Sequence, residues 1–157
     1  MGVGGCLSGK GCGGVNFTTP NLVLCHGVFD VLHLGHVRHL QRARAMGDSL
    51  IVTVTPDRFV SKGDGRPVFN QEQRAECLRA LKFVDHVILN WTPTAVEAIR
   101  FLRPKFFVKG PECRDNQSEK LQAELAAAEE VGAEVVFTDG EIHSSSELVK
   151  KVLAYYE

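Results

Sequence analysis

Short apolar runs that alternate with helical patterns are the feature that most restricts the fold of this 157-residue chain. From residue 21 onward, five runs are rich in β-branched or aromatic residues, as strands covered on both faces are. Segments with helical spacing separate them. The alternation predicts repeated βα units, and therefore a Rossmann-like α/β fold with a five-stranded parallel sheet and helices on both faces. The expected strands are 22–25, 50–55, 86–89, 106–108 and 134–137.

Boundary residues support the helices expected between these strands. Asn70, Thr94 and Ser144 each precede a Gln or Glu by three residues, which is the spacing of a capping box. Gly47 and Gly132 stand where a glycine commonly ends a helix. A last helix should start at the serines near 144 and pack its apolar positions against the sheet. The expected helices are 36–46, 71–81, 95–101, 119–131 and a final one that runs to about residue 155.

The composition indicates one enzyme domain that handles small ligands. With 44% hydrophobic residues the chain can bury a core, but it is too short for two ordinary domains. The net charge of -1 and the lack of a basic block argue against a nucleic-acid partner. No run of 18 apolar residues is present, so no membrane span is expected. Five cysteines without CxxC spacing favour a reducing, cytoplasmic compartment.

The first 20 residues are glycine-rich and are predicted to form a flexible tail ahead of one domain at 21–157. The tail contains a G-x-x-x-x-G-K string. A phosphate-binding loop of that type needs Ser or Thr after the lysine, where this chain has Gly11, and it needs a preceding strand. The tail also lacks the apolar core of a signal peptide, and Cys6 replaces the Ser or Thr expected of a myristoylation signal.

The segment 24–36, LCHGVFDVLHLGH, predicts a phosphate-binding site. An apolar strand runs into glycine, and His33 and His36 stand where a helix should begin. A helix N-terminus offers unpaired N–H groups and partial positive charge, glycines let the backbone approach a ligand, and each imidazole adds a donor. The alternatives are zinc ligation and an ordinary helix surface. Zinc normally takes a third protein ligand, and no nearby Cys pair or H-E-x-x-H pattern supplies one.

Other polar segments should meet these histidines at one edge of the sheet, because an open parallel sheet binds ligands beyond the carboxyl ends of its strands. Lys62 follows the second expected strand, 109–110 follows the fourth, and the serine triplet 144–146 follows the fifth. The serines could simply cap the last helix, with Glu147 closing the box. Beside the histidines, however, they predict a second oxyanion site, and a triphosphate would fit between the two.

The string GVFDVLHLGH at 27–36 resembles the G-x-F-D-x-x-H-x-G-H signature of the cytidylyltransferase-like nucleotidyltransferases. The later segments GRPVFNQEQRAECLRALKFVDHVI, FFVKG and HSSSELVKKVL also resemble motifs of this superfamily, so the likeness covers about residues 22–153. Within it, the chain most resembles the adenylyltransferase domains of ADP-heptose synthases, and next the glycerol-3-phosphate cytidylyltransferases.

The resemblance implies transfer of a nucleoside monophosphate from ATP to a sugar phosphate such as heptose 1-phosphate, with Mg²⁺ on the triphosphate and release of pyrophosphate. The alternatives are a CTP-dependent enzyme that acts on glycerol 3-phosphate or another polyol phosphate, and a nucleotide-binding module without turnover. A homodimer is also implied. A heptose substrate would require a separate sugar kinase, because these residues contain no kinase domain.

The resemblance also implies a role for each motif residue. His33 and His36 would bind the phosphates and stabilise the transition state, Lys62 would neutralise charge from a mobile loop, and no protein group would ligate a metal directly. Ser145 and Ser146 would hold the β- and γ-phosphates. The other residues expected at the nucleotide are Gly27, Val28, Phe29, Asp30, Gly35, Arg74, Lys109, Gly110 and Ser144.

Three of these residues have a simpler explanation. Asp30 is expected to orient the substrate or a Mg²⁺-bound water, unless it caps the first helix. Arg74 is expected to support the active site, unless it lies on a solvated helix face. Lys109 is expected near the nucleoside, although a lysine at a strand end needs no function.

Two departures from the relatives bear on the substrate. Glycerol-3-phosphate cytidylyltransferases carry an arginine where this chain has Asp139, which favours adenylyl over cytidylyl transfer. The adenylyltransferase relatives carry G-G-D-Y where this chain has G-P-E-C at 110–113, so the base and the sugar stay open at this point.

Overall fold

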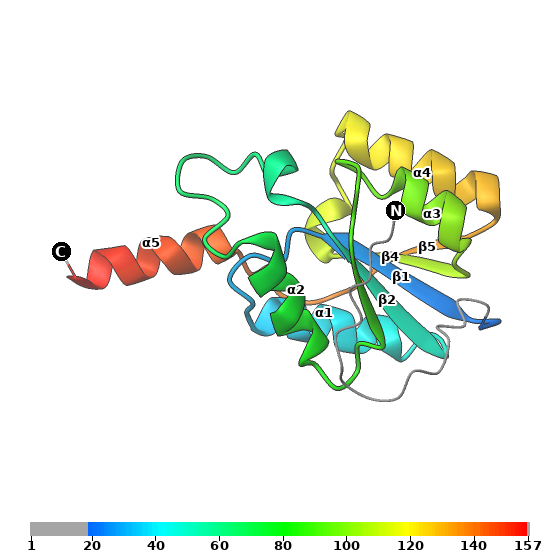
Figure 1. Ribbon diagram of the computed structural model, residues 1–157, viewed down its shortest axis with the longest axis horizontal. Helices are drawn as coiled ribbons and strands as arrows, with labels where there is room; N and C mark the ends of the chain where they lie inside the picture. Colours follow the sequence, from blue (N-terminus) through cyan, green and yellow to red (C-terminus); the bar gives the residue numbers. More distant parts are fainter. Residues whose placement is uncertain (1–18, 157) are drawn as a thin grey trace, which may run out of the picture.

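The computed structural model describes residues 19–156 and shows a five-stranded, fully parallel sheet with helices on both faces (Figure 1). The predicted fold class is confirmed. The flexible tail predicted at 1–20 lies outside the described residues except for its last two positions, and the single domain at 21–157 stays a prediction. The strands are β1 (Leu22–Gly27), β2 (Ser49–Val54), β3 (His86–Leu89), β4 (Phe106–Lys109) and β5 (Glu134–Phe137).

The strand order is β3-β2-β1-β4-β5, with β1 at the centre. The chain first winds from β1 outward through β2 to β3, and then returns to the other side of β1 for β4 and β5. The winding direction therefore reverses between β1 and β4. In open α/β sheets, the crevice at this reversal is where ligands bind, beyond the carboxyl ends of the strands.

The helices are α1 (Leu34–Arg44), α2 (Gln71–Arg79), α3 (Val96–Leu102), α4 (Glu119–Val131) and α5 (Ser145–Tyr156), with 3₁₀ turns at Asp57–Phe59 and Pro111–Cys113. Alternate residues of β1 point to opposite faces of the sheet. Val23 packs with Leu40 of α1 and Leu78 of α2 in one apolar cluster. Leu24 packs with Ile99 of α3 and Ala128 of α4 in the other. Both faces of the sheet are thus buried, as the apolar strands predict.

Two of the predicted helix boundaries are formed as the sequence indicates. Asn70 caps α2 with a complete capping box, in which its side chain accepts from the backbone of Gln73 and the side chain of Gln73 accepts in return. Gly132 ends α4 with φ of 75°, a left-handed conformation that favours glycine.

Two other boundary predictions are wrong. Thr94 does not cap α3, because the N-cap is Ala95 and its backbone N–H is bonded to Glu124 of α4 at 2.9 Å. A distant side chain has therefore replaced the local box. Gly47 is not a left-handed cap either; a Cβ there would collide with the backbone carbonyl oxygen of Asn21, so close approach of two segments explains this glycine.

The last helix also differs from the prediction. Instead of packing its apolar stripe on the sheet, α5 projects away from the body of the protein (Figure 1). Leu148, Val152 and Leu153 are 39%, 56% and 61% exposed, whereas Ser145 at the first turn is buried. The helix α5 is therefore anchored by contacts of its first turn, and packing of its apolar side chains does not hold it. No helix within residues 19–156 is long and apolar enough to cross a membrane.

Candidate active site

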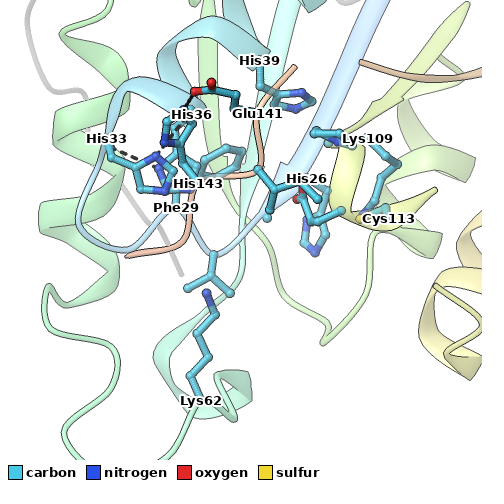
Figure 2. Close-up of a pocket in the computed structure, with 17 residues that line it drawn as sticks. His26, Phe29, His33, His36, His39, Lys62, Lys109, Cys113, Glu141 and His143 are labelled. Atoms are coloured by element: carbon cyan, nitrogen blue, oxygen red, sulfur yellow. Dashed lines mark hydrogen bonds and ion pairs between the residues drawn. The ribbon is translucent and has the colours of Figure 1, made fainter. Parts of the chain in front are cut away.

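A cavity of about 160 Å³ opens at the carboxyl ends of β1 and β4, where the winding of the sheet reverses (Figure 2). The segments after β1, β2, β4 and β5 all contribute to its wall, as the topology predicts. The predicted site residues that line it are Gly27, Val28, Phe29, His33, Gly35, His36, Lys62, Lys109 and Gly110. Asp30, Arg74 and the three serines, Ser144, Ser145 and Ser146, do not belong to this lining.

His33 and His36 form a capping box at the start of α1. Nδ1 of His33 accepts the backbone N–H of His36, and Nδ1 of His36 accepts the backbone N–H of His33, both at 3.4 Å. The two rings are stacked with centroids 3.7 Å apart. Because Nδ1 of each ring accepts a hydrogen bond, the neutral rings carry their proton on Nε2. The cap therefore fixes two N–H donors side by side at a helix N-terminus.

Burial keeps both imidazoles neutral in the free protein. It lowers the pKa of His36 to about 3, and the neighbouring His33 and the Lys62 ammonium contribute to the same shift. Burial also lowers the pKa of His33, with added contributions from His143 and Lys62. An anion in the cavity would oppose these effects, because it favours the charged form of a nearby imidazole. The site is thus preorganised to receive negative charge.

Gly35, between the two histidines, is required by close contact. A Cβ at this position would lie 2.7 Å from Cβ of His143 and 2.9 Å from Cε1 of His33. Real Cβ atoms are not found at such distances, so any larger residue must displace one of these rings. The glycine of the motif therefore brings the loop after β5 against the start of α1.

Three further histidines line the cavity wall, His26, His39 and His143. The sequence placed His26 in the segment 24–36 without giving it a role, and the other two were given no role either. Nδ1 of His26 is 2.9 Å from the Thr53 hydroxyl, and Nδ1 of His39 is 2.9 Å from the Thr138 hydroxyl. Burial lowers the pKa of each of these two imidazoles to about 4.

Only His39 carried a sequence signal. It follows His36 by three residues, so a helix places both on one face. His26 belongs to the segment 24–36, but at the end of an apolar strand nothing distinguishes it from a packed residue. His143 precedes the serines in a loop whose path cannot be read from local sequence, and its ring centroid lies 6.0 Å from that of His33.

The two lysines of the cavity differ in their partners. Nζ of Lys62 comes from an exposed loop and points toward the cavity (Figure 2), where burial and then the charge of Arg66 lower the pKa of its ammonium. Lys109 is buried and ion-paired with Glu124 at 2.9 Å. Glu124 also accepts from the backbone N–H of Ala95, the N-cap of α3, so this pair ties β4 to α4 and to the start of α3. Lys109 therefore has a structural contact as well as a place in the wall.

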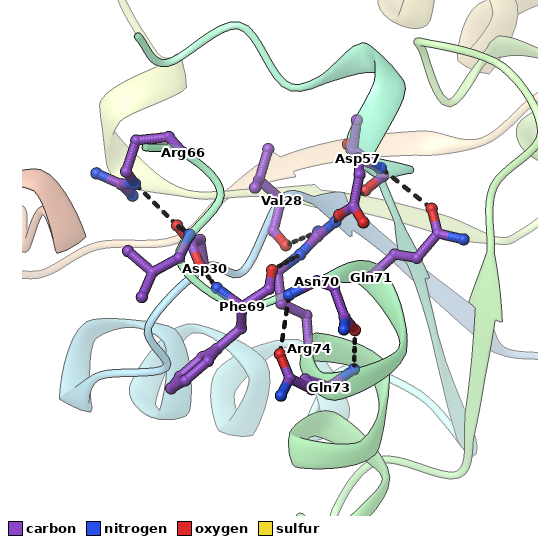
Figure 3. A network of polar contacts seen from close by, with 11 residues as sticks. Val28, Asp30, Asp57, Arg66, Phe69, Asn70, Gln71, Gln73 and Arg74 are labelled. Carbon is purple, nitrogen blue, oxygen red and sulfur yellow. Dashed lines mark hydrogen bonds and ion pairs between the residues drawn. The ribbon is translucent and has the colours of Figure 1, made fainter. Parts of the chain in front are cut away.

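Arg74 lies behind the cavity and is not on a solvated helix face. Its guanidinium is fully buried and donates to the carbonyl oxygens of Val28 (2.6 Å), Thr55 (2.8 Å) and Phe69 (3.0 Å) and to the carboxylate of Asp57 (2.7 Å) (Figure 3). One side chain thus joins the loops that follow β1 and β2. The prediction that Arg74 supports the site fits this position, and its support is indirect.

Asp30 requires a correction, because its side chain neither faces the cavity nor caps α1, whose N-cap is His33. The carboxylate is fully buried and accepts from the backbone N–H groups of Val68 (2.8 Å) and Phe69 (3.0 Å) and from Arg66 (2.8 Å). Burial raises its pKa, but these hydrogen bonds outweigh burial and the net shift is downward. Asp30 therefore anchors the loop between β2 and α2.

Comparisons with known proteins show which family the chain belongs to. Residues 24–151 match the family model described as Cytidylyltransferase-like. The chain belongs to the cytidylyltransferase-like family of nucleotidyltransferases. The predicted resemblance is confirmed, and the whole G-x-F-D-x-x-H-x-G-H signature at 27–36 and the serine triplet at 144–146 lie within the match.

Curated relatives of this cytidylyltransferase-like chain include proteins named Bifunctional protein HldE. The one from Campylobacter fetus subsp. fetus (strain 82-40) is 36% identical over 147 residues, which cover 88% of this chain and 29% of the relative. The one from a Nitratiruptor species is 45% identical over 91 residues, which cover 57% of this chain and 20% of the relative. The chain thus spans less than a third of the length of either relative.

Solved structures show the same fold. A lipopolysaccharide core biosynthesis protein from Thermoplasma volcanium matches with a TM-score of 0.64 and 25% identity, over 78% of this chain and 98% of that one. Pantothenate synthetase from Thermus thermophilus matches with a TM-score of 0.56 and 14% identity, over 82% of this chain and 61% of that one. The second likeness concerns the fold alone.

Proposed function

We propose that this chain transfers a nucleoside monophosphate from a nucleoside triphosphate, with ATP preferred, to a sugar phosphate of the heptose 1-phosphate type, and releases pyrophosphate. The observation that carries the proposal is the pair of Nε2–H donors of His33 and His36 at the start of α1, with the Lys62 ammonium in the same cavity. The likeness to the HldE proteins supports adenylyl transfer and a heptose acceptor.

The reaction needs no nucleophile from the protein. An oxygen of the acceptor phosphate attacks the α-phosphorus in line, the bond to the bridging oxygen of the β-phosphate breaks, and pyrophosphate leaves with that oxygen and its electron pair. A phosphate monoester is already largely ionised near neutral pH, so no general base is required. Catalysis then consists of positioning and of stabilising the charge that develops at the α-phosphorus.

Each group of the cavity has a separate part in this scheme. The imidazole donors face the non-bridging oxygens of the α-phosphate, where charge builds up. Lys62 adds a positive charge from its loop, and closure of that loop excludes water. His143, held against Gly35, closes the wall beside His33. The neutral state of the imidazoles lets them donate hydrogen bonds without repelling Lys62.

Mg²⁺ fits this site as a partner of the triphosphate. Residues 19–156 contain no group of three or more His, Cys, Asp or Glu side chains arranged to hold a metal ion. The cavity wall also includes two carboxylates, Glu112 and Glu141, which could accept hydrogen bonds from water on a triphosphate-bound Mg²⁺ without ligating the metal directly. Bound to the triphosphate, Mg²⁺ would neutralise charge on the leaving pyrophosphate.

The direct test is release of pyrophosphate from ATP or CTP in the presence of a panel of sugar and polyol phosphates. We expect ATP with a heptose 1-phosphate to give the fastest release, and reactions without an acceptor serve as the control. Faster release from CTP with glycerol 3-phosphate would replace the proposed reaction with the cytidylyl one. If the chain binds a nucleotide but no pair of nucleotide and acceptor yields pyrophosphate, the remaining alternative is a nucleotide-binding module without turnover.

Ligand-induced stabilisation provides a second, independent readout. A ligand that binds only the native state raises the melting temperature by mass action. ATP with Mg²⁺ should therefore raise it more than CTP does at equal concentration. A larger shift with CTP would reverse the order of preference.

The proposal also concerns the partners. The acceptor must itself be made by phosphoryl transfer to a sugar, so we infer that a sugar kinase supplies it, and the curated relatives are named bifunctional. We further propose a homodimer, which light scattering of the purified chain would test through the molar mass.

A further inference from the structure

Arg66 connects two parts of the molecule that are remote in sequence. Its Nε donates to Asp30 at 2.8 Å, while its two terminal nitrogens donate to the hydroxyls of Ser146 and Ser145, each at 2.8 Å. The side chain is 8% exposed, and its carboxylate partner is fully buried. The loop after β2, the turn after β1 and the first turn of α5 therefore meet at one guanidinium, and Figure 3 shows its contact with Asp30. Sequence reasoning gave Arg66 no role.

The direction of these hydrogen bonds fixes what the serines can do. A guanidinium has N–H donors and no acceptor, so each serine oxygen must accept from Arg66. Each hydroxyl proton is then left to donate to another group. Among residues 19–156, neither hydroxyl of Ser145 or Ser146 has a further hydrogen-bond partner. Each hydroxyl therefore keeps a proton that it can still donate, although Ser145 is buried and neither serine lines the cavity.

The surroundings identify the class of anion. Ser145 and Ser146 begin α5, where backbone N–H groups are unpaired, and they follow His143 of the cavity wall by two and three residues. Lys62 stands four residues before Arg66 on the same loop and also lines the cavity. Asp30 balances the charge of Arg66. Three of the five guanidinium N–H groups donate to Asp30, Ser145 and Ser146, and the other two have no hydrogen-bond partner among residues 19–156. The serine hydroxyls, the backbone N–H groups at the start of α5 and the Lys62 ammonium are several donors in one region. A diphosphate, which carries several negatively charged acceptor oxygens, is the kind of anion that such a set of donors would bind.

We propose that Arg66 is a positioning residue for the leaving pyrophosphate: it orients the hydroxyls of Ser145 and Ser146, which the family resemblance already places at the β- and γ-phosphates, so that they can donate to that group. This inference rests on the proposed function, because it assigns the pyrophosphate half of the same nucleotide. It also explains why Asp30 is buried. The carboxylate fixes the plane of the guanidinium, and the guanidinium fixes the serines.

The test compares the affinities of inorganic pyrophosphate and of AMP, measured by calorimetry, in the unaltered protein and in Arg66→Lys. Lysine keeps the charge but cannot donate to Asp30 and both serines in one plane. We expect pyrophosphate to bind at least about 10-fold more weakly to Arg66→Lys, and AMP to change by less than about 3-fold. Arg58→Lys is the matched control, because Arg58 belongs to the same connection and donates to Trp91 away from the cavity.

A variant at the serines separates positioning from folding. Ser145→Ala with Ser146→Ala removes the two hydroxyls and leaves the Asp30–Arg66 pair in place. It should weaken pyrophosphate binding about as much as Arg66→Lys does, and the triple variant should lose little more, because residues that act as a unit are not additive. Unchanged pyrophosphate affinity in the double serine variant would overturn the proposal, even if Arg66→Lys fails to fold.

Two further outcomes bear on the proposal. Equal losses of AMP and pyrophosphate affinity in Arg66→Lys would show a general structural role and would also overturn it. If no nucleotide and acceptor pair yields pyrophosphate, the proposed function fails, but the pyrophosphate and AMP affinities still decide the role of Arg66.

Discussion

At the scale of single residues, the site depends on how each imidazole is held. A lone H-x-x-H string is compatible with zinc, with a helix surface or with a phosphate site. The reciprocal bonds at Nδ1 and the stacked rings favour the phosphate site, because they turn both Nε2–H groups into fixed donors. This arrangement depends on local sequence alone, and for that reason the motif could be interpreted before the fold was known.

Replacement of His36 by Ala tests whether this donor acts on the transition state. We expect kcat to fall by about 10²-fold or more, the size expected for loss of one preorganised donor, while ATP affinity falls much less. His86→Ala, a histidine of β3 outside the cavity, is the control. Turnover at the normal rate would remove His36 from the active site, and loss of bound zinc from the variant would revive the metal-site alternative.

Replacement of Gly35 by Ala tests the close contact at the centre of the motif. The new Cβ must push away His143 or the ring of His33, so kcat should fall by about 10-fold or more. Urea denaturation should show a smaller effect, with a loss of about 1–3 kcal/mol in the free energy of unfolding, the usual range for overpacking. Full activity in Gly35→Ala would mean that the loop around His143 moves aside freely.

At the scale of elements, the loops after β1 and β2 are held by one buried side chain. Arg74 donates to three carbonyl oxygens and a carboxylate, so it serves as a connector between segments that have no regular structure. An arginine on an amphipathic helix normally lies in solvent. Its burial here depends on where the loops of two other elements run, and the sequence of α2 contains no sign of that.

The variant Arg74→Lys should therefore lower both stability and activity. A lysine keeps the charge but leaves several of the four acceptors without a donor, and such losses at a buried charged group amount to about 3–5 kcal/mol. Arg79→Lys, on the exposed side of the same helix, should change the free energy of unfolding by less than about 0.5 kcal/mol. Urea denaturation of the two variants makes the comparison. Equal stability in both would show that Arg74 is not a connector.

Element boundaries show where local sequence stops being sufficient. Asn70 and Gly132 were predicted correctly because capping depends on neighbours within a few residues. The Thr94 box failed because Glu124, distant in sequence, supplies the acceptor instead. The packing of α5 failed for a related reason: its apolar stripe indicates a helix that needs a partner surface, but a stripe does not say which surface. Arg66, which anchors the first turn of α5, was equally invisible.

At the scale of the whole molecule, buried neutral imidazoles make stability depend on pH. His26, His36 and His39 have folded-state pKa values of about 4, 3 and 4, below the ordinary value of about 6.5. Between pH 4 and pH 6.5 the unfolded chain therefore binds more protons than the folded chain does. The free energy of unfolding should therefore fall as the pH is lowered from about 6.5 to 4, by about 1.4 kcal/mol per pH unit for each proton taken up.

Urea denaturation at pH 7, 6 and 5 measures this dependence. His39→Gln removes one of the three imidazoles while keeping a polar group near Thr138, so its stability should depend less steeply on pH. A flat profile between pH 7 and pH 5 would show that these imidazoles are already accessible to protons in the native state.

The central place of β1 has a consequence for how the protein folds. β1 pairs with β2, which follows soon after it in the chain, but its other edge must wait for β4, which lies beyond two further helices. Pairings between distant segments close large loops and slow the search for the native state. During synthesis, β1, β2 and β3 can assemble while one edge of β1 still lacks its neighbour. Because residues that follow β4 form part of the cavity wall, the cavity around the histidines cannot be complete until β4 has paired with β1.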